Sequence, residues 1–362
     1  MNPVNPMKGN ARMPEYGAIG ITAGGTARPD VADPAGGEDD GSRAVIDVHH
    51  HFCAPAWREW AERQGLVNPK AMPPWARWDA RTALELMDRA GIATAVLKPM
   101  MYARYESSAQ LREATTVTLR AAVEVVEAHP GRFVFHTPLF LEDPQVSSWA
   151  LRQGLDELGA VGVNVTANHG GIYLGDPSYD KIFAELDERS AVVDTHPHNL
   201  PGGPAGGPPG AATVPGLPNF LCDFLLDTTR AAANMIRNRT LDRFPNLSVI
   251  LPHGGGFLPH IAARLEAFAH SFDPPVEPAA VRDHLHRFYY DTAGPLSPAG
   301  TLLATVSPDR ILFGSDWPAC PAAVITDVAV PALAADPAFT PALRRAVNRE
   351  NALRLMPALV RA

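Results

Sequence analysis

Short apolar segments alternate with longer amphipathic segments along most of the chain, and this alternation constrains the fold more than any other feature. The short segments have the length and the β-branched content of buried strands. We expect eight strands, at residues 44–49, 93–98, 132–137, 161–167, 191–195, 247–251, 288–292 and 310–314.

The longer segments between these strands have helical patterns. Residues 79–91, 109–131 and 145–160 each carry apolar side chains at helical spacing, with a Gly or Pro near the end. Strands that alternate with helices are typical of a parallel sheet, and eight such units favour a closed barrel. The fold class is therefore predicted to be α/β, a (β/α)₈ TIM barrel.

Composition fits a single barrel domain with a tail. The chain has 362 residues, of which 46% are hydrophobic, and this supports one large core over residues 43–362. Residues 1–42 are rich in Gly, Pro, Ala and Asp and show no apolar period. We expect a disordered N-terminal extension there.

Charge and cysteine content exclude several classes of partner. The net charge of −8 and the lack of a Lys/Arg run disfavour binding to nucleic acid or an anionic membrane, so a small molecule is the expected partner. Three widely spaced cysteines suggest neither a disulfide framework nor a zinc knuckle. Without a membrane span or a signal-peptide core, a cytoplasmic location is expected.

The first strand carries three consecutive histidines in the sequence VIDVHHHF. A period of two divides it into two faces, with Asp47, His49 and His51 on one and Ile46, Val48 and His50 on the other. We expect the apolar face to contact the helices and His50 to serve packing. His49 and His51 could then chelate one metal at the barrel mouth, although three histidines alone are equally compatible with a solvated turn.

Three further strands end in groups of the same chemistry, namely His196, His253 and Asp316. Barrel enzymes carry their functional groups at the carboxyl ends of the strands, which all open at one face. Side chains that follow strands one, five, six and eight would therefore converge there. This pattern predicts a metal-dependent catalytic site.

These motifs resemble the amidohydrolase superfamily, over about residues 44–357. The family pattern has HxH after strand one, His after strands five and six, and Asp after strand eight. The segments ILPHGGGFLPHIAARLE, FGSDWP and LDTTRAAANMI are similar to one branch of it. That branch contains aminocarboxymuconate semialdehyde decarboxylase and the salicylate-type decarboxylases, including the methylsalicylate enzymes.

The resemblance implies one divalent metal and no organic cofactor. Its ligands would be His49, His51, His196 and Asp316. Binuclear relatives use a carboxylated lysine at the end of strand four, where this chain has Asn164 and no lysine nearby. Three imidazoles and a carboxylate suit Zn²⁺ best, with Mn²⁺ also compatible.

Two residues are implied to act in catalysis. Asp316 would both contact the metal and shuttle a proton. His253, which precedes three glycines that would let the backbone approach a ligand, would activate water or polarise the substrate rather than bind the metal. A buried histidine bonded to backbone is the structural alternative for His253.

Other substrate-binding candidates have equally good structural explanations. Arg230, Asp227 and Asp223 lie at a helix after the Pro/Gly tract 200–218, which could be a lid or a linker, and they could instead cap that helix or pair at the surface. Trp317 could contact an aromatic substrate as one wall of its pocket, or it could pack within the barrel. His198 and His169 could line the mouth, but they are expected in loops or behind the residues that contact the substrate.

Arg264 suggests a homodimer. It stands eleven residues beyond His253, where the aminocarboxymuconate branch sends an arginine into the neighbouring subunit's site. A helix-face arginine paired with Glu266 is the alternative. The branch also grips a substrate carboxylate with an arginine after strand one, but residues 66–79 offer only Lys70 and Arg77.

The predicted function is non-oxidative decarboxylation of a small aromatic or unsaturated carboxylic acid, hence a carboxy-lyase. A hydrolase of a small ester, lactone or amide could use the same mononuclear site. A catalytically silent metal-binding scaffold is the third possibility. It fits less well, because structural zinc sites favour closed and often cysteine-rich shells.

Overall fold

The computed structural model describes residues 45–201, 214–296 and 299–360. The expected extension over residues 1–42 and most of the Pro/Gly tract 200–218 lie outside the described residues.

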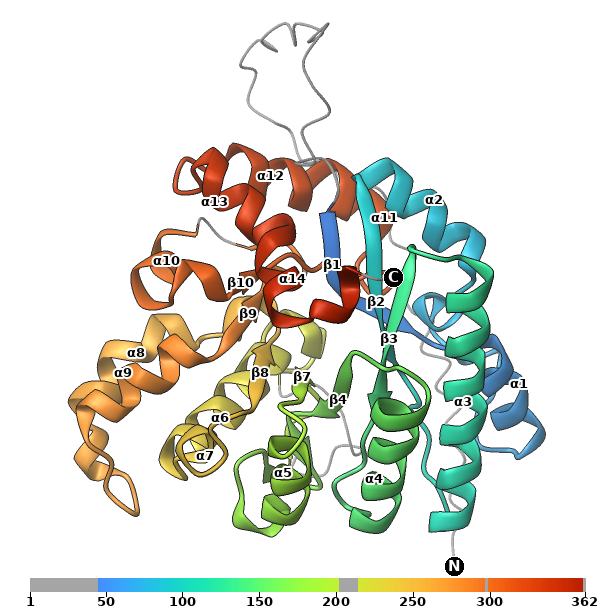
Figure 1. The fold of residues 1–362 in the computed structure, drawn as a ribbon, viewed down its shortest axis with the longest axis horizontal. Coiled ribbons are helices and arrows are strands. Elements are labelled where there is room, and N and C mark those ends of the chain that lie inside the picture. The colour runs from blue at the N-terminus through green and yellow to red at the C-terminus, as the bar shows by residue number, and fades with distance from the viewer. Residues whose placement is uncertain (1–44, 202–213, 297–298, 361–362) are drawn as a thin grey trace, which may run out of the picture. The chain divides into compact units, whose positions relative to one another are not determined.

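Eight parallel strands form the barrel, and they pair in the order in which they occur along the chain. The strands are β1 (Val45–Phe52), β2 (Ile92–Pro99), β3 (Phe133–Pro138), β4 (Gly162–Thr166), β7 (Val192–His196), β8 (Ser248–Leu251), β9 (Tyr289–Asp291) and β10 (Ile311–Leu312). Backbone bonds from Val48 N to Phe313 O, 2.9 Å, and from His51 N to Trp317 O, 2.6 Å, join the last strand segment to the first. The predicted (β/α)₈ barrel is confirmed (Figure 1).

Helices surround the strands (Figure 1). They are α1 (Pro55–Arg63), α2 (Ala80–Ala90), α3 (Ser108–Ala128), α4 (Pro144–Leu151), α5 (Asp180–Asp187), α6 (Asp223–Arg237), α7 (Thr240–Arg243), α8 (Leu258–Ala267), α9 (Pro278–Arg287), α10 (Gly300–Thr305), α11 (Ala322–Val324), α12 (Val330–Ala335), α13 (Pro341–Arg345) and α14 (Asn351–Leu355). Among the described residues, none of these helices combines the length and apolar character needed to cross a bilayer.

Local signals explain where the predicted helices begin and end. The Asp79 side chain accepts a bond from Thr82 N and caps α2, and Gly91, at φ 70°, closes it in a left-handed conformation. Asp143 caps α4 in the same way through Val146 N. A π-type turn over Arg152–Glu157 continues α4. A short hairpin of β5 (Asn168–His169) and β6 (Ile172–Tyr173), which the periodicity did not predict, follows β4.

An apolar cluster fills part of the barrel interior. It is a buried cluster with members from six strands, Ile46, Val48, Val96, Val134, Val192, Ile250 and Leu312. Strands that are not neighbours in the sheet contribute to this one cluster, so its side chains meet inside the barrel. Ala352 of α14 and Met356 pack against the same cluster. The expectation that Ile46 and Val48 face the outer helices is therefore wrong.

A bulge in β1 explains this difference. Asp47 pairs with Ala95 and His50 with Leu97, so three steps along β1 match two steps along β2. The extra residue shifts the alternation of faces. As a result Val48 and His49 both contribute to interior groups, while Asp47 bonds to His50 rather than sharing a face with His49.

Candidate metal centre

Four side chains converge at the carboxyl ends of the strands. His49 and His51 come from β1, His196 ends β7, and Asp316 follows β10. One ligand atom from each lies within 4.8 Å of all the others. The first two histidines and Asp316 are closest, with 3.3 Å between the Nε2 atoms and 2.9 Å from His51 Nε2 to Asp316 Oδ1. The structure thus brings together the four predicted ligand residues.

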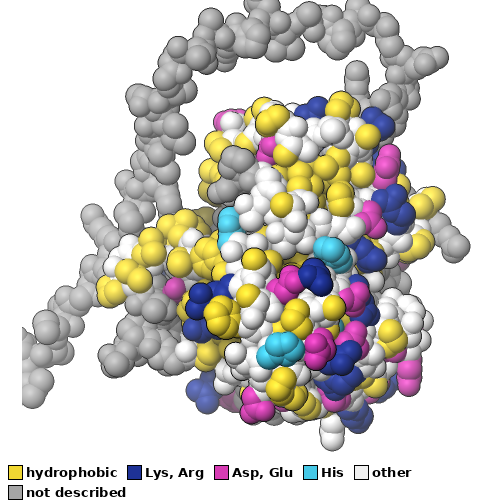
Figure 2. All heavy atoms as spheres, turned by 90° about the vertical axis from the view of Figure 1, so that its left-hand side faces the viewer, with side chains coloured by type: hydrophobic (Ala, Val, Ile, Leu, Met, Phe, Trp, Pro, Cys, Tyr) yellow, Lys and Arg dark blue, Asp and Glu magenta, His cyan; other side chains and the backbone are white. Residues whose placement is uncertain are grey.

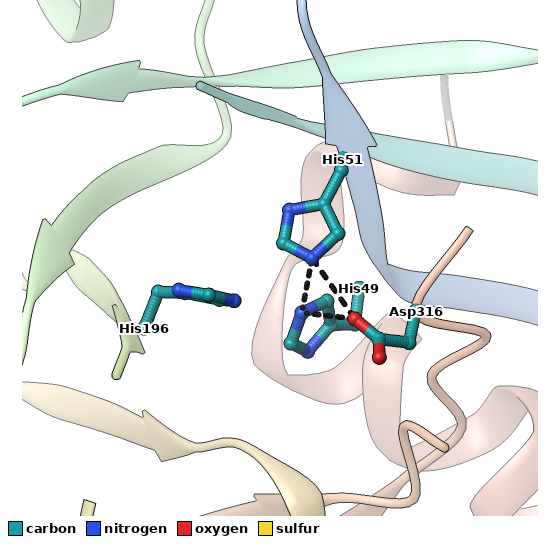
Figure 3. Close-up of side chains that lie close together, drawn as sticks. All are labelled: His49, His51, His196 and Asp316. Carbon is teal, nitrogen blue, oxygen red and sulfur yellow. Dashed lines mark hydrogen bonds and ion pairs between the residues drawn. The ribbon is translucent and has the colours of Figure 1, made fainter. Parts of the chain in front are cut away.

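His196 approaches this group from the opposite side (Figure 3). Its ring centroid lies 4.8 Å from that of His51 and 5.5 Å from that of His49. His196 is 5% exposed, and both other histidines are more deeply buried. The imidazoles therefore enclose a small space from two sides, with Asp316 on the side of His49 and His51.

Hydrogen bonds to the other ring nitrogens orient two of the imidazoles. Asp291 Oδ2 lies 2.7 Å from His49 Nδ1, and the Pro197 carbonyl oxygen lies 2.7 Å from His196 Nδ1. Both acceptors require a proton on Nδ1, which leaves the Nε2 lone pair free to bind a cation. Such outer bonds fix the tautomer and raise the basicity of a ligand.

The buried position of these histidines favours their neutral form. Burial lowers the pKa of His49 well below its ordinary value, and the charge of Lys98 lowers it further. Burial is also the main cause of the lowered pKa of His196, followed by the charge of His51. The pKa of His51 is lowered by burial despite the opposing bond to Asp316.

The donor set fits a divalent metal. The Nε2 atom of His49 carries a lone pair and lies 3.4 Å from the Oδ1 atom of Asp316 and 3.3 Å from the Nε2 atom of His51. Electron-rich atoms at this spacing in a buried site repel one another unless a cation lies between them. Neutral imidazoles and an ionised carboxylate are the ligands that Zn²⁺ and related ions take.

Asp316 is ionised in this setting. Burial alone would raise its pKa, but the neighbouring His253, His51 and His49 side chains hold the pKa well below its ordinary value. Its backbone lies in the left-handed region at φ 63°. Few non-glycine residues adopt this conformation, and those that do often lie at functional sites.

His253 faces the other oxygen of the same carboxylate. Its Nε2 atom lies 3.8 Å from Asp316 Oδ2, and its backbone N–H donates to Asp291 Oδ1 at 2.9 Å. Burial lowers the pKa of His253, but the nearby Asp316 carboxylate outweighs burial, and the net pKa is raised. His253 is absent from the four-residue group of convergent ligand atoms.

The glycines after His253 serve packing. A Cβ on Gly255 would meet the Tyr290 ring at 2.8 Å, and one on Gly256 would meet the Leu225 carbonyl oxygen at 2.2 Å. Both contacts are shorter than real Cβ atoms make. The tight turn therefore brings His253 toward the site by packing closely on β9 and α6.

The predicted substrate-binding residues make other contacts in the described chain. Arg230 is exposed on α6, with its Nη1 atom 3.5 Å from the Tyr173 hydroxyl. Arg264 is exposed on α8, and its guanidinium carbon lies 5.3 Å from the Phe268 ring centroid. Trp317 packs against a small buried cluster that includes Cys320.

The loop residues also have definite partners. His169 Nδ1 lies 2.6 Å from Glu142 Oε2, and the His198 backbone N–H donates to Asp227 Oδ2 at 2.8 Å. The His198 ring lies 5.9 Å from the Tyr102 ring, and the Tyr102 hydroxyl lies 3.4 Å from His196 Nδ1. Tyr102 therefore borders the site, although no pattern in the sequence pointed to it.

Sequence reasoning also missed a charged group inside the barrel. Lys98 of β2 is 1% exposed, and its Nζ atom lies 2.9 Å from Asp194 Oδ1. Asp194 Oδ2 lies 3.2 Å from His136 Nδ1. One sequence feature could have identified Lys98. It follows the apolar residues of a parallel strand, and such strands are buried on both faces. Asn164 on β4 pairs in register with Asp194 on β7, and β4 contains no lysine.

A second group of possible ligands lies far from the strand ends. Asp242, Asp283 and His284 also bring their ligand atoms within 4.8 Å of one another. Both carboxylates are already paired, because Arg287 Nη1 lies 3.0 Å from Asp242 and 3.4 Å from Asp283. An arginine between the acids disfavours a metal there.

Comparisons with known proteins agree with this geometry. The family model described as Amidohydrolase matches residues 46–357. The chain is 29% identical to 6-methylsalicylic acid decarboxylase of Aspergillus aculeatus, over 88% of this chain and 97% of that protein. It is 28% identical to gamma-resorcylate decarboxylase of a Rhizobium species, over 66% of this chain and 76% of that protein.

Solved structures share the fold. A dihydroxybenzoic acid decarboxylase from a Polaromonas species, solved with manganese and the inhibitor 2-nitroresorcinol, superposes with a TM-score of 0.71 at 22% identity. The match covers 87% of this chain and 97% of that one. Because the family model spans most of the chain and its motif residues converge in space, this protein is a member of the amidohydrolase family.

Proposed function

We propose that the protein is a metal-dependent, non-oxidative decarboxylase of a small aromatic carboxylic acid of the salicylate type. The observation that carries this proposal is the position of Asp316, which lies among the metal-ligand candidates and also faces His253. The 6-methylsalicylic acid and gamma-resorcylate decarboxylases to which the chain is similar support the same reaction class.

His49, His51, His196 and Asp316 would hold one divalent metal. Bound there, the cation supplies Lewis-acid charge that orients and polarises a carboxylate and a neighbouring hydroxyl of the substrate. The set of three nitrogens and one oxygen favours Zn²⁺. The manganese in the Polaromonas relative makes Mn²⁺ the competing ion. Metal analysis of the purified protein decides between them.

Asp316 and His253 would transfer the proton that replaces the carboxylate on the substrate. The pKa of His253 is raised, and its Nε2 atom lies 3.8 Å from Asp316 Oδ2, so a protonated His253 would be placed to return a proton to this carboxylate. Protonated Asp316 then donates to the ring carbon that bears the carboxylate. The bond to the carboxylate carbon breaks, its electron pair restores the aromatic ring, and CO₂ leaves. Placing the donor beside the reacting carbon is how general acids contribute to rate.

The substrate side of the site is part of the same proposal. We assign Trp317 and Arg230 as mouth residues that contact the bound acid, and Arg264 as a carboxylate ligand supplied by the partner subunit of a homodimer. The face that carries α8 and α9 shows apolar side chains among charged ones (Figure 2), and Phe268, beside Arg264, is 57% exposed. A guanidinium suits a carboxylate because it can donate two parallel bonds.

The test compares decarboxylation with hydrolysis on one preparation. Metal-reconstituted protein is incubated with a panel of 2-hydroxybenzoates and with matched aryl esters and lactones, while CO₂ and product masses are followed. We expect CO₂ from at least one hydroxybenzoate, and its loss after chelation. Turnover of the esters alone would support a hydrolase instead. Asp316→Asn and His253→Ala should each abolish turnover while circular dichroism shows an intact fold.

A further inference from the structure

Asp47 on β1 accepts four hydrogen bonds, and these connect β1 to the segment that follows β10. Asp47 is completely buried, and its Oδ1 atom accepts from His49 N at 3.1 Å and from Ser315 N at 2.8 Å. Its Oδ2 atom accepts from the Ser315 hydroxyl at 2.6 Å and lies 3.2 Å from His50 Nδ1. One carboxylate thus ties β1 to the residue that precedes Asp316.

His50 extends this group outward from the strand. Its Nε2 atom accepts the indole N–H of Trp78 at 3.2 Å, so its proton resides on Nδ1 and points to Asp47. Both rings are buried, at 0% exposure for His50 and 3% for Trp78. An uncharged imidazole held between a donor and an acceptor has one tautomer and one orientation. The side chain that the sequence assigns to packing is therefore a member of a continuous hydrogen-bonded row.

The row ends at the strained backbone of Asp316. The Ser315 hydroxyl accepts the N–H of Trp317 at 3.1 Å, and Asp316 N donates to His49 O at 2.9 Å. These bonds hold both neighbours of a residue whose φ is 63°. A left-handed aspartate persists only where its surroundings determine it. Gly314 also permits the approach, because a Cβ there would lie 2.8 Å from His49 Cβ.

We propose that the row Trp78–His50–Asp47–Ser315 positions Asp316 for its work in the site. These are positioning residues, because none of the four belongs to the group of convergent ligand atoms. They act by fixing where the Asp316 oxygens lie relative to the three histidines and to His253. The part of this inference that concerns turnover by Asp316 rests on the proposed function. The placement of Asp316 beside the histidines does not depend on it.

The test uses Ser315→Ala with Ser147→Ala as its matched control. Ser147 is another buried serine, and its hydroxyl donates to the Phe140 carbonyl at 2.7 Å and accepts the Phe140 N–H at 3.0 Å. Each variant is loaded with Co²⁺, whose visible absorption reports ligand geometry. We expect one Co²⁺ per chain in both, an altered spectrum for Ser315→Ala, and a wild-type spectrum for Ser147→Ala.

Kinetics provide the second readout. For Ser315→Ala we expect kcat to fall roughly tenfold or more with KM within about twofold, because a misplaced proton donor affects the reacting state rather than substrate binding. Ser315→Thr keeps the hydroxyl that bonds to Asp47 and should restore much of kcat. Trp78→Phe removes the donor to His50 while keeping an aromatic ring in the core, and it should shift the spectrum and kcat in the same direction.

Each outcome bears on the proposal. Wild-type Co²⁺ spectra in both Ser315→Ala and Trp78→Phe would overturn it, as would losses equal to those of Ser147→Ala. If Ser315→Ala fails to fold, Trp78→Phe decides alone. If the wild-type protein decarboxylates no substrate, the proposed function fails, while the Co²⁺ spectra still show whether the row positions Asp316.

Discussion

The Nδ1 atom of His49 lies 2.7 Å from the Oδ2 atom of Asp291, and both side chains are completely buried. The same carboxylate accepts the backbone N–H of His253 at 2.9 Å through Oδ1. Asp291 therefore connects a metal-ligand candidate to a proton-transfer candidate. Burial raises its pKa, while the charge of Lys98 opposes that rise.

Asp291→Asn should weaken metal binding without unfolding the barrel. An amide nitrogen facing His49 Nδ1 would favour the tautomer with a proton on Nε2, which removes the lone pair from the site. Loss of such an outer partner typically lowers metal affinity roughly 10- to 100-fold. Competition with a chromophoric chelator measures this. Asp143→Asn, at the N-terminus of α4, serves as control, and an unchanged affinity for Asp291→Asn would contradict the assigned tautomer.

His196→Ala should lose metal more completely, because it removes a ligand rather than a ligand's partner. His198→Ala is the matched control, since it lies two residues away and outside the group of convergent atoms. Elemental analysis after dialysis should find about one metal per chain in the wild type and in His198→Ala. Wild-type metal content in His196→Ala would show that the ligand assignment is wrong.

The sequence predicted most of the fold because the strands and their polar ends obey local rules. Period and length identify eight strands, and the shared direction of parallel strands brings His49, His196 and Asp316 to one mouth. The bulge in β1 could not be predicted in this way, because it depends on the register against β2.

The roles of Asp291, Lys98 and Asp194 could not be identified from the sequence, because they depend on contacts between distant parts of the chain. Asp291 ends a predicted strand, but a strand-ending aspartate looks the same in sequence whether it binds a metal or an imidazole. Lys98 and Asp194 lie in strands that never neighbour each other in the sheet, so their 2.9 Å contact exists only across the closed barrel. Whether two such side chains meet depends on the width of the barrel interior, and a local sequence pattern does not contain this information.

Asp227 should give the protein a pH-dependent stability. It is completely buried, and burial raises its pKa from 3.8 to about 6 although bonds from His198 N and Asn168 oppose this. Between these two pKa values the folded state holds more protons than the unfolded state. The free energy of unfolding therefore falls as pH rises from about 4 to 6, by on the order of 3 kcal/mol, and is then constant.

Asp227→Asn removes this ionisation and should therefore remove its contribution to the pH dependence of the free energy of unfolding. Urea unfolding at pH 4 and at pH 7 measures it, and the variant should be more stable relative to wild type at pH 7 than at pH 4. Parallel stability curves for the two proteins would contradict the raised pKa.

Arg264 can be tested by mixing inactive chains. If it reaches the partner subunit's site, Arg264→Ala and Asp316→Asn should each be inactive, and a hybrid dimer should regain part of the activity because one of its sites is complete. Arg282→Ala, on the exposed surface of neighbouring α9, is a suitable control and should stay active. A fully active monomer, or an unchanged kcat/KM in Arg264→Ala, would exclude the trans arginine.

The most direct measurement of the central claim follows the carboxylate carbon and the incoming proton together. A 2-hydroxybenzoate labelled with ¹³C in its carboxyl group is incubated with the metal-loaded protein in deuterated water, and gas and product are analysed by mass spectrometry. We expect ¹³CO₂ and one solvent deuterium on the ring carbon that lost the carboxylate, and neither product from Asp316→Asn. A metal-loaded protein that turns over substrates only to products retaining every carbon and gaining the elements of water would contradict it.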